Sequence, residues 1–193
     1  MQIISYRWMP ILNLLPFLGL FVNELFIQHL TLSGYFAIAL FVLNTIRLLT
    51  WHTPGIWKKP LLWSLFCAFL FIDLGFLLFA LSTFGGVSKF LAIHAFTYGG
   101  IGLGTLGMMA RVALGHTGRR ISDPPAMITW GIRVLLVGGI IRIFIPLVSP
   151  SNYVLWITMS QVCWIVAFAI FIFTYAGILI GSSATNLVPS HRS

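Results

Sequence analysis

Six long apolar runs follow one another along this chain, and each is long enough to cross the hydrocarbon core of a membrane. The chain has only eleven Lys and Arg and three Asp and Glu among its 193 residues. In soluble domains about a quarter of the residues are charged, so this chain cannot cover the surface of a soluble fold. Disorder is excluded as well, because disordered chains are poor in apolar residues. The sequence therefore predicts an all-α, polytopic membrane protein.

Short segments rich in Pro, Gly and polar residues separate the apolar runs, and such segments are typical of loops. A helix needs about 20 apolar residues to span a bilayer. We therefore expect residues 1–193 to form a single transmembrane domain, a bundle of six helices in the lipid bilayer. The predicted spans cover approximately residues 8–27, 32–49, 61–83, 90–115, 126–148 and 153–180.

The distribution of Lys and Arg predicts how the bundle is oriented. Lys58, Lys59, Arg119, Arg120 and Arg192 fall on the same side of the membrane as the N-terminus. Because cytoplasmic loops are enriched in Lys and Arg, we expect both termini to be cytoplasmic. This bias also accounts for much of the net charge of +8, and no nucleic-acid partner is expected.

The fourth predicted span carries most of the candidate chemistry. Gly102, Gly104 and Gly107 form the pattern G-x-G-x-x-G, which in a dinucleotide-binding fold follows a strand and opens a helix. Here the pattern lies inside a membrane helix, so we interpret Gly100, Gly104 and their neighbours as a small-residue face for close helix packing, which would also suit a flat cofactor. His94 and His116 are 22 residues apart, about 33 Å along a helix, so they cannot ligate one metal ion.

Ionisable side chains at membrane depth are costly and are functional candidates by default. Asp73, Arg133 and Arg142 are such residues. Arg133 and Arg142 are nine residues apart, so they face opposite sides of their helix. For Asp73 and Arg142, two interpretations stay open. They form a structural pair between two helices, or they build a polar site together with His94. An arginine that faces away from the bundle centre also predicts a second copy of the chain or a second membrane subunit.

The fourth span resembles the signature of the NnrS family. The matching motifs are HAFT at 94–97, MMARV at 108–112 and LGHTGR at 114–119. Supporting matches are PLLW at 60–63, Arg142 with Pro146, and Trp164 with Ala167 and Phe168. The resemblance runs from about Trp51 to Ile180 and corresponds to the carboxyl-terminal half of family members. The histidine-rich early region of the family is missing, and Phe66 stands where the family usually has a histidine.

The resemblance implies a bacterial inner-membrane protein that contains haem b, with copper as a second cofactor. It also implies a role in the response to nitric oxide or nitrosative stress. The implied cofactor-binding residues are His94, Arg111, His116, Arg119 and Arg142. His94 and His116 are the candidate metal ligands, with His94 as the preferred axial ligand of a haem.

No nucleophile and base are evident in the sequence, so an enzymatic activity is left open and is not favoured. The alternative function is that of a cofactor-free transporter-like or structural membrane subunit. In that case Asp73 and Arg142 would form a polar site inside the bundle.

Overall fold

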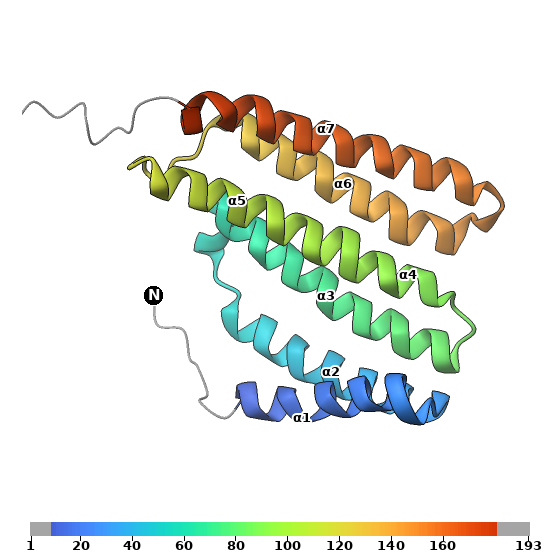
Figure 1. Cartoon of the computed structure of the whole chain (residues 1–193). Coiled ribbons are helices and arrows are strands. Elements are labelled where there is room, and N and C mark those ends of the chain that lie inside the picture. The colour runs from blue at the N-terminus through green and yellow to red at the C-terminus, as the bar shows by residue number, and fades with distance from the viewer. Residues whose placement is uncertain (1–8, 181–193) are drawn as a thin grey trace, which may run out of the picture.

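The computed structural model describes residues 9–180, which form a bundle of helices with no strand in this range (Figure 1). Six of the helical segments are long and apolar enough to cross a membrane, as the sequence predicts. Trp8, the predicted start of the first span, and Arg192, used in the prediction of orientation, lie outside the described residues.

The six membrane-length segments begin and end within a few residues of the predicted spans. Two of them combine α-helix with π-helix, and short 3-10 turns occur in two of the connections. The elements are α1 (Met9–Val22), the π-helix η1 (Asn23–Ile27), α2 (Leu30–Trp51), the 3-10 turn η2 (Pro54–Lys58), α3 (Pro60–Phe84), α4 (Lys89–His94), the π-helix η3 (Ala95–Gly102), α5 (Leu103–His116), α6 (Ala126–Val148), the 3-10 turn η4 (Pro150–Asn152) and α7 (Tyr153–Ile180).

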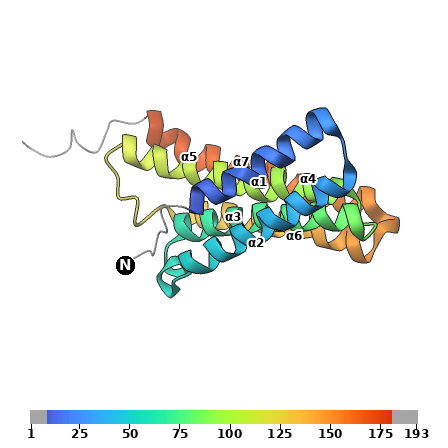
Figure 2. The same ribbon diagram turned by 90° about the horizontal axis from the view of Figure 1, so that it is seen from below.

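Neighbouring spans pack against each other in chain order. In Figure 1, α1 and α2 lie at the bottom, α3 with α4 and α5 in the middle, and α6 with α7 at the top. Figure 2 shows α1 on the outside of α2, and α1 itself contains no buried residue. The start of α1 and the end of α7 lie at the same end of the bundle, together with the loops that carry Lys58, Lys59, Arg119 and Arg120. We call this the basic end.

Glycines let the middle helices approach closely, on more than one face of the fourth span rather than on a single one. A Cβ atom added at Gly99 or Gly107 would collide with side chains of α3, and one added at Gly102 would collide with Trp164 of α7. Gly138 of α6 is covered in the same way by Tyr98 of η3. Helices that lack a driving force from water gain contact energy by such close approach.

The fourth span differs from the uniform α-helix that its sequence predicts. Residues Ala95–Gly102 are π-helical, and three of these eight residues are glycines, so few side chains oppose the wider turn. The span ends in a Schellman motif, in which Gly118 has a φ of 68° and the Arg119 N–H donates to the Leu114 carbonyl at 3.0 Å. These two features set the positions of the histidines at either end of the span.

Candidate functional site

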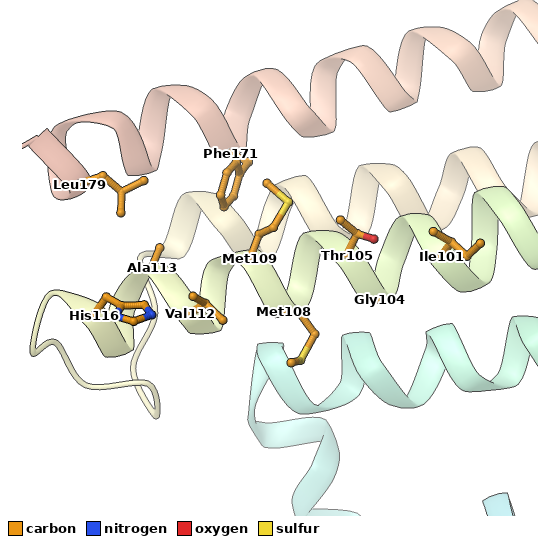
Figure 3. A pocket seen from close by; sticks show the side chains of 10 residues that line it. All are labelled: Ile101, Gly104, Thr105, Met108, Met109, Val112, Ala113, His116, Phe171 and Leu179. Carbon is orange, nitrogen blue, oxygen red and sulfur yellow. The ribbon is translucent and has the colours of Figure 1, made fainter.

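An apolar groove of about 860 Å³ runs along α5 beside α7 (Figure 3). Its volume falls within the range of small-molecule sites, about 300–1,000 Å³. The small residues Gly104 and Ala113 leave space along α5, and Met109 points toward Phe171 of α7. The groove is lined by Ile101, Gly104, Thr105, Met108, Met109, Val112, Ala113, His116, Phe171 and Leu179.

His116 lies at the end of this groove, in the last turn of α5, with its side chain exposed. Among the four histidines in residues 9–180, the other three are engaged in hydrogen bonds. His29 accepts from the Leu32 N–H, His52 accepts from the Trp57 indole, and His94 is bonded to a tyrosine. His116 forms no hydrogen bond within the described range, so both of its ring nitrogens are available to a ligand.

Arg111 and Arg119, which the resemblance implies as cofactor-binding residues, lie near the same end but are not among the residues that line the groove. Arg111 lines a separate cavity of about 210 Å³ together with Lys59 and Ser122. Arg119 follows His116 by three residues and is exposed in the loop after α5. Arg119 therefore lies near His116 at a similar membrane depth, whereas Arg111 faces the start of α3.

His94 belongs to a different cluster at the opposite end of the bundle. Its Nε2 atom and the Tyr153 hydroxyl lie 3.2 Å apart in a hydrogen bond between α4 and α7. One turn later, Tyr98 donates to the Ser160 carbonyl at 2.6 Å. Arg142 of α6 donates from Nη1 to the Ser160 hydroxyl at 3.0 Å, and its guanidinium carbon lies 5.5 Å from the centre of the Tyr98 ring.

Asp73 is not part of this cluster, so both interpretations that joined it to Arg142 are wrong. Its side chain is buried and accepts a hydrogen bond of 2.7 Å from Thr45 of α2, while its Oδ1 atom is buried without a partner. Asp73 thus faces α2 on one side of α3, whereas Arg142 faces α7. A transporter-like polar site shared by Asp73 and Arg142 therefore has no basis in the described residues.

The two arginines of α6 face opposite sides, as predicted. Arg133 is exposed and lies over the ring of Trp130, with its guanidinium carbon 4.8 Å from the ring centre. Arg142 is half-buried and turned toward α7. The nine-residue spacing was sufficient to predict this difference.

Sequence reasoning missed Tyr98, Tyr153 and Ser160, which surround Arg142 and His94. Tyr98 was detectable, because it follows His94 by four residues and so shares its helix face. Tyr153 and Ser160 lie on α7, and they could not be predicted without knowing how that helix packs against α4 and α6. The ion pair between Lys89 and Glu24, at 2.7 Å, was also missed.

Six membrane-length helices in one bundle, with a ligand-sized apolar groove, define a polytopic α-helical membrane protein. The family model described as NnrS protein matches residues 1–182, so the chain belongs to the NnrS family. The match includes the first two spans and corrects the expectation that the resemblance begins near Trp51 and is limited to a carboxyl-terminal half. Those spans carry no local motif, only an apolar pattern, which is why the motifs indicated a shorter match. No curated protein and no solved structure matches the chain.

Proposed function

We propose that this protein is a haem-binding inner-membrane protein that acts in the response to nitric oxide or nitrosative stress. Membership of the NnrS family supports this role. The observation that carries the proposal is the groove along α5, which ends at a histidine whose imidazole has no hydrogen-bond partner in residues 9–180. The groove favours His116 over His94 as the ligand of the iron, because His116 lines the groove and His94 lies at the opposite end of the bundle.

The residues of the groove fit a porphyrin. Its walls are apolar, its volume suits a ligand of that size, and a histidine and two methionines supply donors that proteins use as axial ligands of haem. His116 would hold the iron, and the side chains of Met109 and Phe171 would contact the macrocycle. Arg119 would form an ion pair with a propionate at the membrane surface. When bound, the haem would supply an iron centre to which nitric oxide can coordinate.

The described residues do not fit a copper centre held by this chain alone. Between residues 9 and 180, no three His, Cys, Asp or Glu side chains come together. The methionines of the groove are soft donors, but His116 lies about 10 Å or more further along the same helix, so it cannot join them around one ion. Our proposal therefore includes haem and does not include copper.

The proposed orientation places the basic end of the bundle in the cytoplasm, following the bias of Lys and Arg. The loops around Lys59 and Arg119 then lie inside, and the turns near Gly85 and Ser151 lie outside. Reporter fusions after Pro60 and Ser122 should report a cytoplasmic location, and fusions at the two turns should report an external one. A reversed pattern at two sites would contradict this orientation.

The test of haem binding is an absorption spectrum of the purified protein, with iron analysis, after expression with haem available. We expect a Soret band from the unmodified protein, its loss or shift in His116→Ala, and a band of unchanged position in His94→Ala. A Met109→Ala variant should keep the band at reduced occupancy, because it removes one contact of the macrocycle.

Two results would contradict the proposal in different ways. A protein without a Soret band and without iron would remove haem from the function. A band that is lost in His94→Ala and kept in His116→Ala would move the haem to the opposite end of the bundle.

A further inference from the structure

Two cations from different parts of the chain line one cavity at the basic end of the bundle. The cavity has a volume of about 210 Å³ and lies where the start of α3 meets α5 and the loop after it (Figure 1). Lys59, which precedes α3, and Arg111 of α5 contribute the charges, and Ser122 contributes a hydroxyl. The remaining lining residues are Pro60, Leu61, Leu62 and Ile121.

The polar side chains of this cavity are free to bind a ligand. Lys59, Arg111 and Ser122 form no side-chain hydrogen bond or ion pair with any residue in the described range 9–180. Asp123, the acidic residue next to Ser122, does not line the cavity and forms no ion pair in that range. Within the described part of the chain, two positive side chains therefore share a cavity without a negative partner.

The backbone adds to the positive potential of the cavity. The helix α3 begins at Pro60, and no side chain caps this end by a hydrogen bond. The first N–H groups of a helix carry a partial positive charge and are a common place for phosphate groups to bind. Leu61, the second residue of α3, lines the cavity, so the helix end lies beside Lys59 and Arg111. Together these features match the charge of a phosphate group.

An apolar groove leads away from the cavity along α3. It has a volume of about 430 Å³ and shares Leu62 with the cavity. From Leu62 to Ile72 it follows α3 for about 15 Å. This length is about half the 30 Å thickness of the hydrocarbon core, so the groove matches the depth of one leaflet. The groove is lined by Trp51, Ile56, Leu62, Leu65, Phe66, Ala68, Phe69, Ile72, Gly100 and Gly104.

We propose that the cavity and the groove together bind one anionic phospholipid, with its phosphate between Lys59 and Arg111 and an acyl chain in the groove. Basic pockets between membrane helices recognise anionic headgroups in this way. A free phosphate ion would leave the groove empty, and the ammonium group of a zwitterionic lipid would be repelled by the two cations. Neither Lys59 nor Arg111 lines the groove at His116, so the proposal does not rest on haem binding.

The test is native mass spectrometry of the purified full chain, expressed without added haem and freed of lipid in nonionic detergent, with dioleoyl phosphatidylglycerol as the probe. The solution is ammonium acetate of about 0.15 M, in which charges more than about 8 Å apart are largely screened. We expect one saturable site, with an affinity at least about tenfold higher than that for dioleoyl phosphatidylcholine. Lys59→Gln and Arg111→Gln should each lower the affinity about fivefold, the contribution of one cation close to a lipid phosphate.

Matched controls distinguish this site from the general charge of the basic end. Lys58→Gln and Arg120→Gln remove the same charge from positions that do not line the cavity, so each should change the affinity by less than about twofold. Leu62→Trp fills the junction of the cavity and the groove and should lower the affinity, whereas Leu70→Trp, at an exposed position of the same helix, should not. Circular dichroism of each variant establishes that the helices are intact.

Three results would overturn the proposal. The first is equal affinity for the anionic and the zwitterionic lipid. The second is an equal effect of Lys59→Gln and Lys58→Gln, which would reduce the site to a general attraction by the basic end. The third is displacement of the lipid by an equal concentration of inorganic phosphate, which would assign the cavity to a free phosphate ion. Lys59 is exposed, so its variant tests the proposal even where Arg111→Gln does not fold.

Discussion

Gly138→Ala should destabilise the protein measurably, because the new methyl group has no room. A Cβ atom at this position would overlap the hydroxyl of Tyr98 and the Cβ atom of Cys163. Overpacking of this kind costs about 1–3 kcal/mol. The displaced Tyr98 hydroxyl would also lose its 2.6 Å hydrogen bond to the Ser160 carbonyl, about 1 kcal/mol more. The higher helix propensity of alanine offsets about 1 kcal/mol, which leaves a net loss of about 2 kcal/mol.

Gly177→Ala is the matched control, because an added Cβ atom there meets nothing within 4 Å. It should leave the free energy of unfolding unchanged or raise it by up to about 1 kcal/mol. The assay is equilibrium unfolding in mixed micelles of increasing SDS content, followed by circular dichroism. Equal stability of the two variants, or a destabilised Gly177→Ala with an unaffected Gly138→Ala, would refute the packing derived for η3, α6 and α7.

Three further outcomes are expected. Thr45→Val should lower the free energy of unfolding by about 1–3 kcal/mol in the same assay, because it leaves the buried carboxyl of Asp73 without its donor. The control is Thr158→Val, which removes only a hydrogen bond to the carbonyl of the preceding turn and should have a much smaller effect. Lys89→Gln should cost less than about 1 kcal/mol, because its ion pair with Glu24 is substantially exposed, and high salt should abolish the difference. Mass measurement in mild detergent should give at least a dimer, and a strictly monomeric protein with full haem content would contradict that assembly.

The number and position of the spans could be predicted from the sequence because bilayer thickness sets the length of an apolar run. The opposite orientations of Arg133 and Arg142 were predictable for a similar reason, since they depend only on the angle per residue within one helix. Both predictions use information local to a segment. Neither requires knowledge of which helices are neighbours.

The partners of polar side chains could not be predicted, because they depend on contacts between segments far apart in the chain. Asp73 is bonded to Thr45, 28 residues earlier, and His94 to Tyr153, 59 residues later. The resemblance favoured His94 over His116 as a metal ligand, whereas in the structure His94 is bonded to Tyr153 and His116 lines the groove. Hydropathy also cannot separate an α-helix from a π-helix, since both bury the same apolar residues.

The π-helical stretch Ala95–Gly102 lies between the two ends of the fourth span, and so it sets the angle at which those ends face their neighbours. A π-helical turn holds more residues than an α-helical turn, so it shifts the phase of every side chain that follows. Deleting one residue between Tyr98 and Leu103 would change the angle between the side chains of His94 and Tyr98 and that of His116, without altering a side chain at either end. Changes of length there would therefore act together on the polar cluster around Arg142 and on the groove at His116, and they offer a way to alter the mutual orientation of these two regions that no single substitution provides.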